Sequence, residues 1–497
     1  VVQLFLHADI DAGLSHAGRG DNGGIATLLV QLGDALLDAG RSTTRTVTLS
    51  RGRPSDATVG LGDLARPAHH YASVPLWGPP VHAAEAWPLR VAARRGIRRV
   101  LRAAQPDLVH LRMADVGSMA AAEAAAELGI PTVLTLAPDP HALVQARDQA
   151  GTLTRAGFGE ADLAEHLVFR DRLLRRLASD AAHLVLFPRP TLRADLQTLL
   201  GIDLDDPAVR ATVVAEGIDL SGIDRARREV AAADVAAADV AEEPRRAPLP
   251  PALADLDSLL GSLPRERRHL PVALSVGRLH RVKGMATLVE TWAGHGELSD
   301  RCNLLIVGGD LEAPNDDESG ELTRIRTEVP DEDAPRRGLI LAGHRPNSVV
   351  RLWMAAVRRG RPGLAAPDGV YVAASLKEEF GIAIVEALTS GLVVVAPEAG
   401  GPATYVEEGV TGVLVDTSSP EALAEAVMSA LDLAADTGAA AGADSARAAL
   451  RERFGIDATA TALDEVYRDV ASSHRRAAGR EQGRALEPAP ASSGARS

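Results

Sequence analysis

Short apolar runs that could form buried strands alternate with segments of helical periodicity along most of the chain. Such alternation is typical of α/β architecture with parallel sheets. One expected helix spans 25–38, where an apolar residue recurs every three or four positions and Gly40 follows as a stop signal. A second is expected at 119–128. The expected strands are 2–6, 46–49, 108–111, 132–136, 183–187 and 211–215 in the first half, and 272–276, 304–307, 338–342, 370–373, 393–396 and 412–415 in the second.

A change of composition divides the chain into two domains. With 497 residues it is too long for one ordinary core. The stretch AAADVAAADVAEEPRRAPLPP is rich in Ala, charge and Pro, which is typical of a linker or a surface insertion. The sequence therefore predicts a first domain at 1–222, a linker or insertion at 223–268 and a second domain at 269–455. A helix-like segment at 456–471 and a disordered tail at 472–497 follow.

Composition excludes some classes of function. The net charge of −14 argues against a nucleic-acid groove, which would be basic. The single cysteine, Cys302, can form no intrachain disulfide, and no apolar run reaches the roughly 18 residues needed to span a bilayer. The opening VVQLFLH lacks the basic flank and cleavage site of a signal peptide, so the expected location is the cytoplasm. No Ser-His-Asp, zinc-spaced or Walker-type pattern occurs in the sequence.

The segment at 375–416 holds the most informative candidate site. Glu378 and Glu386 stand eight positions apart, on either side of a turn that begins a helix. The unpaired N–H groups of a helix N-terminus can hold hydroxyl-rich or anionic ligands. Two solvent-exposed glutamates are the alternative interpretation. The glycines that bracket this helix favour a ligand site, for a sugar and a nucleotide rather than for a metal.

Two further segments carry groups suited to phosphate. In SVGRLHRVKG, Arg278 and Lys283 stand in a loop between a strand and a helix, where two cations suit a diphosphate. Alone, such a pair is also typical of solvated surface. In the first half, Gly23 and Gly24 begin a helix that Asp21 or Asn22 could cap, and they would let a phosphate or sugar approach the backbone. A tight turn that needs glycine explains them equally well.

These motifs together resemble a known family. The segment EEFGIAIVEALTSGLVVVAPEAGGPATY resembles the Glu-x7-Glu region of retaining glycosyltransferases with the two-domain GT-B fold, most of all sucrose synthase and sucrose-phosphate synthase. SVGRLHRVKG and LLIVGGD resemble sucrose synthase segments, and the stretch LHADIDAGLSHAGRGDNGGIATLL resembles the opening of sucrose-phosphate synthase. The resemblance implies two Rossmann-like domains facing a central cleft, with the helix at 456–471 crossing back to the first domain.

The resemblance also implies roles for the donor side. Arg278 and Lys283 would stabilise the leaving diphosphate, Glu386 would accept hydrogen bonds from the ribose, and Glu378 would bind the hexose. The donor would be a UDP-, ADP- or GDP-hexose, with no cofactor or metal required. The loop at 344–347 would contact its base through the backbone. The backbone N–H groups expected to hold the hexose are those of Phe380, Gly381 and Ile382.

The acceptor side is less defined. His141, in APDPHALVQ, resembles the histidine beside the transferred sugar, although four residues separate it from its strand. His110, in DLVHLR, is a competing candidate that is more often structural in this family. Arg189, with Arg193, stands where sucrose-phosphate synthase carries STRQEI, which implies a phosphorylated acceptor. An exposed arginine with no ligand is the alternative interpretation.

The sequence therefore predicts a retaining hexosyltransferase that moves a hexose, glucose first, from a nucleotide sugar to a sugar or a sugar phosphate. Alternatives are transfer to an inositol phosphate or a natural-product aglycone, and a non-catalytic nucleotide-sugar-binding protein. A Rossmann oxidoreductase ranks below these because no GxGxxG follows the first strand. The oligomeric state stays open.

Overall fold

The computed structural model describes residues 1–485 except 8, 15–23, 39, 53–61, 63, 65, 77–85, 137–139, 150, 239–248 and 437–439. The N-terminal domain is built on a parallel sheet of seven strands in the order β3-β2-β1-β4-β5-β6-β7. Its strands are β1 Val2–Phe5, β2 Thr46–Gly52, β3 His69–Pro75, β4 Val109–Leu111, β5 Thr132–Leu136, β6 His183–Leu186 and β7 Ala211–Val213.

Six of these strands coincide with expected ranges, whereas β3 was not expected. Its first residues, His69, His70 and Tyr71, are polar or amphipathic, so the strand has no apolar run. It pairs with β2 at the edge of the sheet, where only one side needs a hydrogen-bonding partner. The helices of this domain are α1 Gly24–Ala35, α2 Arg90–Ala104, α3 Val116–Glu127, α4 Pro140–Gln149, α5 Phe158–Glu165, α6 Leu167–Asp180 and the short α7 Leu192–Asp195.

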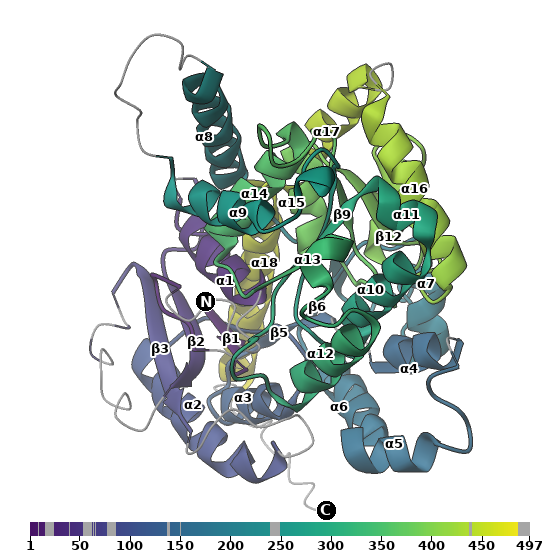
Figure 1. Ribbon diagram of the computed structural model, residues 1–497. Coiled ribbons are helices and arrows are strands. Elements are labelled where there is room, and N and C mark those ends of the chain that lie inside the picture. The colour runs from purple at the N-terminus through teal and green to yellow at the C-terminus, as the bar shows by residue number, and fades with distance from the viewer. Residues whose placement is uncertain are drawn as a thin grey trace, which may run out of the picture.

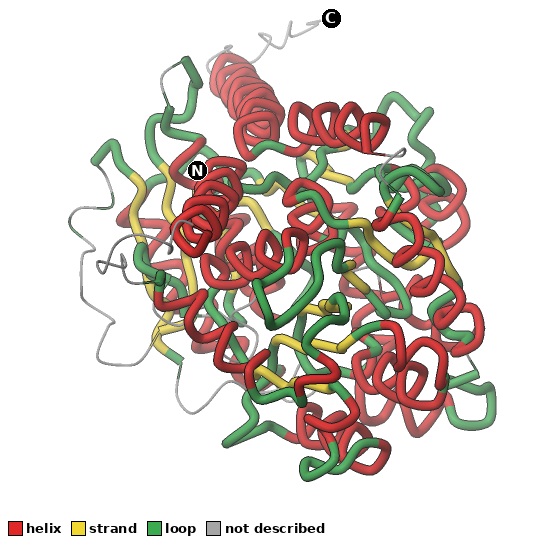
Figure 2. The backbone as a smooth tube through the Cα atoms, turned by 45° about the horizontal axis from the view of Figure 1, so that its top comes forward, coloured by secondary structure: helices red, strands yellow, loops and turns green. Residues whose placement is uncertain are grey.

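The C-terminal domain repeats the architecture with six parallel strands, ordered β10-β9-β8-β11-β12-β13. Helices flank the strands in both domains (Figures 1 and 2). The prediction of two Rossmann-like parallel sheets is confirmed. The strands are β8 Val272–Val276, β9 Asn303–Val307, β10 Leu339–Gly343, β11 Val370–Val372, β12 Val393–Pro397 and β13 Gly412–Val415. The helices are α10 Met285–Gly294, α11 Gly296–Arg301, α12 Asp316–Glu328, α13 Ala334–Arg337, α14 Asn347–Arg359, α15 Ile382–Ser390, α16 Pro420–Ala435 and α17 Ala440–Phe454.

The segment at 223–268 is more ordered than a linker. It contains most of α8, Leu220–Ala238, and all of α9, Pro251–Gly261. Both helices contact α14 and bury apolar side chains in the C-terminal core, among them Val230 and Leu256. Of the two expected alternatives, an insertion fits these positions better than a linker does, because alanine, although it adds little apolar surface, is the best helix former.

The last described helix, α18 Ile456–Ala485, lies against the N-terminal domain. Its residues Leu463, Val466 and Tyr467 share an apolar cluster with side chains of α1, β5 and β6. The helix continues to Ala485, so the expectation of a disordered tail from 472 was wrong over 472–485. Arg, Ala and Glu in this stretch are good helix formers that extend a helix already anchored by packing. Within the described ranges, no helix combines the length and apolar character needed to cross a bilayer.

Candidate active site between the two domains

The strand order defines where a ligand can approach each sheet. In the C-terminal sheet β8 lies between β9 and β11, so the chain connections run in opposite directions from this point. Ligands of open α/β sheets bind outside the carboxyl ends of the strands at such a switch point. The loop after β8 carries Arg278 and Lys283, and the loop after β11 leads to Glu378. The predicted donor residues thus stand on the two loops that flank the switch point.

A short ion pair joins these two loops. Lys283 Nζ lies 2.6 Å from Glu378 Oε1, and the Ser375 hydroxyl donates to the same oxygen over 2.6 Å. The side chain of Lys283 keeps 31% of its surface exposed, while that of Glu378 keeps 14%. Arg278 is exposed in the same loop as Lys283. The structure therefore brings Lys283 and Glu378 together and leaves both cations accessible to an anion.

The glycine pair after β12 shapes the backbone around Glu378. Gly400 has φ 103°, and a Cβ at this position would lie 2.1 Å from the carbonyl oxygen of Glu378. The N–H of Gly401 donates to that carbonyl over 2.9 Å. Any side chain at Gly400 would therefore push the Glu378 loop away, which explains why glycine stands here.

Buried aromatic residues fix the N-terminus of α15. Gly381 precedes the helix with φ 84°, and the Tyr405 hydroxyl donates to the Phe380 carbonyl. The rings of Phe380 and Tyr405 both pack against Phe454. Burial raises the pKa of Tyr405 well above its usual value, so its phenol stays a hydrogen-bond donor. The first N–H groups of α15 are thus held in place at the end of the helix next to Glu378.

Glu386 is the centre of a buried polar network. Its side chain is only 5% exposed, and the amide of Asn347 donates to both of its oxygens, over 3.1 and 3.3 Å. Arg351 Nε donates to Glu386 Oε1 over 3.1 Å, and Arg351 Nη1 donates to Asp219 Oδ2 over 2.9 Å. Asp219 stands just before α8, so Arg351 links Glu386 to the connection between the domains. A Cβ at Gly222 would lie 2.4 Å from Arg351 Nη1, so the link depends on a glycine there.

A pocket beside this network is lined by both domains. Gly24 at the start of α1 faces Ile382 at the start of α15, since a Cβ at Gly24 would lie 3.7 Å from Ile382 Cδ1. Gly23, with Asp21 and Asn22, lies outside the described residues. Two helix N-termini thus converge where the donor was expected. The pocket is lined by Gly24, Thr27, Leu28, Gln31, Gly217, Ile218, Asn347, Arg351, Ile382 and Glu386.

The two candidate histidines have different environments. His141, on α4, forms an ion pair with Asp171 and lies 3.1 Å from Arg175 Nη2, so the structure places it against α6. These contacts do not join it to the donor loops, and its role stays a prediction. His110 is buried between the Tyr467 hydroxyl at 2.6 Å and Thr135 Oγ1 at 2.7 Å. Burial lowers the pKa of His110 well below its usual value, as suits a neutral structural residue.

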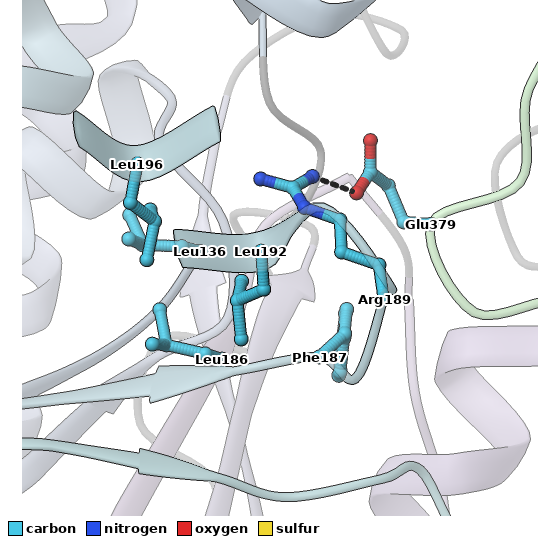
Figure 3. A pocket seen from close by; sticks show the side chains of 7 residues that line it. All are labelled: Leu136, Leu186, Phe187, Arg189, Leu192, Leu196 and Glu379. Atoms are coloured by element: carbon cyan, nitrogen blue, oxygen red, sulfur yellow. Dashed lines mark hydrogen bonds and ion pairs between the residues drawn. The ribbon is translucent and has the colours of Figure 1, made fainter. Parts of the chain in front are cut away.

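Arg189 forms ion pairs with two carboxylates. Its Nη1 donates to Glu379 Oε2 over 3.0 Å (Figure 3). Its Nε lies 3.1 Å from Asp195 Oδ2. Glu379 belongs to the C-terminal domain, so the first pair connects the domains beside Glu378. Arg193 instead pairs with Asp205 at the surface. Arg189 also lines a small pocket, together with Leu136, Leu186, Phe187, Leu192, Leu196 and Glu379.

Two polar pairs at this side of the N-terminal sheet were missed in the sequence. His7 Nε2 lies 2.6 Å from Asp115 Oδ2, at the switch point between β1 and β4. Arg112 lies 3.4 Å from Glu216, and both side chains are largely buried. Burial raises the pKa of the Glu216 carboxyl, Arg112 opposes this, and the nearby charge of Glu378 raises it further. Their position in the sequence could have identified these side chains, because they follow the carboxyl ends of β1, β4 and β7.

Two family models match separate parts of the chain. Residues 22–221 match the model "Glycosyltransferase Family 4", and residues 270–432 match "Glycosyl transferases group 1". Sucrose synthase 2 of Pisum sativum is 30% identical over 174 residues, which are 34% of this chain and 20% of that protein. The sucrose synthase of Acidithiobacillus caldus is 31% identical over 174 residues, 34% of this chain and 21% of that protein. The chain thus spans about a fifth of the length of these relatives.

Solved structures resemble nearly the whole chain. Sucrose-phosphate synthase from Thermosynechococcus elongatus aligns with a TM-score of 0.65 at 20% identity, covering 95% of this chain and 99% of that one. A trehalose-6-phosphate synthase aligns with a TM-score of 0.64 at 14% identity, covering 94% and 98%. At such identities the likeness shows the fold, while the family models show the type of enzyme. The chain is a glycosyltransferase of the GT-B fold, with a Glycosyltransferase Family 4 domain followed by a Glycosyl transferases group 1 domain.

Proposed function

We propose that this protein is a retaining hexosyltransferase that moves a hexose, glucose first, from a nucleoside diphosphate sugar to a sugar or a sugar phosphate. The observation that carries the proposal is the Lys283–Glu378 pair, which joins the two loops at the switch point of the C-terminal sheet. A cation and a carboxylate fixed 2.6 Å apart offer neighbouring contacts for a phosphate and for a hydroxyl-rich ring. The solved neighbour from Anabaena is described in complex with UDP and glucose, which supports a donor of this class.

The chemistry follows from these positions. The bond between the sugar's anomeric carbon and the diphosphate oxygen breaks, and the leaving diphosphate takes the bonding electron pair. Arg278 and Lys283 stabilise this developing negative charge, which is the kind of preorganised electrostatic contact that contributes most to many catalysed reactions. The acceptor oxygen forms the new bond on the same face of the ring, and its proton passes to the departing phosphate oxygen. Glu378 and the N–H groups at the start of α15 hold the hexose hydroxyls.

Glu386 has only part of its hydrogen-bonding capacity left for a ribose. Its two oxygens already accept bonds from Asn347 and Arg351. A carboxylate has about four acceptor positions, so ribose hydroxyls would use the remaining lone pairs rather than displace a partner. We therefore assign Glu386 as a ribose contact that Arg351 holds in one orientation. The base would lie near the pocket that Gly24 and Ile382 share.

A second candidate acceptor is favoured by the surroundings of Arg189. Two carboxylates already compensate its charge, so an acceptor phosphate would have to displace Glu379 or Asp195. The adjoining pocket is lined mainly by leucine and phenylalanine side chains (Figure 3). The pairing of Arg189 with two carboxylates favours an acceptor without a phosphate, such as a natural-product aglycone, over a phosphosugar.

A donor-by-acceptor panel tests both acceptors. UDP-, ADP- and GDP-glucose are each combined with fructose, fructose 6-phosphate and an aromatic aglycone, and release of nucleoside diphosphate is followed. Release stimulated by fructose 6-phosphate alone supports the phosphosugar, whereas release with the aglycone alone supports the second candidate. The Arg278→Ala variant should lose about two to three orders of magnitude in turnover while keeping the fold. Its matched control is Arg326→Ala on α12, an exposed arginine outside the site. Equal turnover in the two variants would refute the diphosphate assignment.

A further inference from the structure

The exposed face of α2 is basic, whereas the chain as a whole is acidic. Six of the fifteen residues of α2 are arginines, and the helix holds no acidic residue, whereas the whole chain has a net charge of −14. Its inner face buries Ala93, Ile97 and Leu101 against the N-terminal core. Gly96 lets the helix approach β3 closely, because a Cβ there would lie 2.8 Å from Val74. The helix is therefore firmly seated, and its outer face is a fixed surface.

The arginines of α2 fall into two groups. Arg94 and Arg98 are tied to Glu127 on α3. Arg95, Arg99 and Arg102 are exposed at spacings of four and three, so they form one stripe along the outer face. None of these three has an ionic partner among the described residues. We call them the arginine stripe. Three aligned guanidinium groups are suited to binding several phosphates at once.

Exposed apolar side chains continue the line of the stripe at the start of the helix. Val91 lies one turn before Arg95 and is 50% exposed, and Trp87, one further turn back, is 48% exposed. Arg90 stacks over the Trp87 ring at 4.5 Å, and Phe169 on α6 contacts the ring edge-on at 5.4 Å. Next to Phe169, Val168 is 39% exposed. The arginine stripe thus ends in an apolar patch held in place by packing.

We propose that this face of α2 binds an anionic lipid surface. Tryptophan is the side chain most suited to the boundary between headgroups and acyl chains, and valine adds apolar area beside it. The arginine stripe would contact lipid phosphates at the level that Trp87 reaches. A nucleic acid or another soluble polyanion would use the arginines but would gain nothing from Val91. Figure 1 shows α2 in the lower part of the molecule, with α14 and α15 in the upper part. A lipid surface bound to α2 would therefore leave α14 and α15, which line the candidate site, uncovered.

Vesicle sedimentation of the full chain tests the proposal. Wild-type protein should sediment with vesicles containing about one third phosphatidylglycerol and should stay in solution with pure phosphatidylcholine. Replacing the stripe (Arg95→Gln, Arg99→Gln, Arg102→Gln) should lower the partition coefficient by about tenfold or more. The matched control makes the same charge change on α8, whose exposed arginines lie far along the chain from α2 (Arg225→Gln, Arg227→Gln, Arg228→Gln).

The apolar patch needs a separate variant. Val91→Gln keeps the helix and removes exposed apolar area, and it should weaken vesicle binding by about threefold or more. Trp87→Phe should abolish any blue shift of tryptophan emission on vesicle addition. An equal loss of binding in the α8 control, or equal sedimentation with both kinds of vesicle, would overturn the proposal. Retention on heparin together with vesicle binding that is insensitive to Val91→Gln would assign the stripe to a soluble polyanion and also overturn it.

Discussion

The buried link through Arg351 gives the sharpest prediction about stability. In Arg351→Met the aliphatic stem is roughly preserved, while Glu386 and Asp219 lose their shared cation. Removing one partner of a buried ion pair costs about 3–5 kcal/mol. The lower end applies here, because Asn347 still donates to Glu386 and the Asp219 side chain is 28% exposed. We expect a loss of about 3 kcal/mol in the free energy of unfolding of the transition that includes the C-terminal domain.

The assay is urea unfolding followed by circular dichroism, with calorimetric titration of UDP as a second readout. UDP affinity should fall by about tenfold, because Glu386 is no longer held in one orientation. The control is Arg359→Met on the same helix, whose ion pair with Asp234 lies at the surface, where such pairs contribute at most about 1 kcal/mol. In the double variant Arg351→Met/Glu386→Gln the losses should be less than additive by about 1.5–3 kcal/mol. Strict additivity, or equal losses in the two arginine variants, would refute the idea of a buried coupled network.

Three other outcomes follow from the site and its support. Gly400→Ala should reduce turnover more than tenfold, because its Cβ would collide with the Glu378 loop. The control Gly40→Ala has nearly the same φ of 101° but open space around it, so it should lose only the roughly 1–3 kcal/mol of stability that backbone strain costs. Equal turnover in the two variants would contradict the collision. Because the pKa of Glu216 is raised in the fold, its contribution to stability is present below the ordinary value of 4.5 and is lost as pH rises through the folded value. Glu216→Gln should therefore flatten the fall of stability between pH 4.5 and the folded pKa of Glu216. An unchanged pH profile of the unfolding free energy, measured by urea titration, would rule this out. Tyr467→Phe should cost about 1–3 kcal/mol by leaving His110 Nδ1 without its partner, measured as a lower urea midpoint.

The sheets were predictable because buried parallel strands are continuous apolar runs, visible without knowledge of their neighbours. Strand β3 was missed because its first residue, His69, finds partners far away in sequence. The His69 ring lies between Asp34 and Thr48, which no local pattern reveals. Helix α8 was missed for a different reason, since an alanine-rich segment looks the same in a linker and in a packed helix.

The proximity of Lys283 to Glu378 was predictable from local chemistry, whereas their roles toward a donor stay predictions. Lys283 was identified as a cation in a loop after a strand, and Glu378 was identified as a carboxylate near glycines. Arg351 was not predictable in this way, because the sequence does not distinguish it from Arg358 and Arg359 on the same helix. Its partner Asp219 stands 132 positions away. The environment of Arg189 was equally hidden, because its partner Glu379 belongs to the other domain.

The return of α18 to the first domain has a consequence for synthesis of the protein. Val133 and Val185 of the N-terminal sheet are completely or almost completely buried, and they share a cluster with Leu463 and Val466 of α18. When only the first domain has emerged from the ribosome, its sheet therefore has one uncovered apolar strip. That strip stays uncovered until the second domain has also emerged. Premature termination anywhere before α18 would leave an aggregation-prone chain rather than a smaller folded unit, and a chaperone would find its binding surface on this strip.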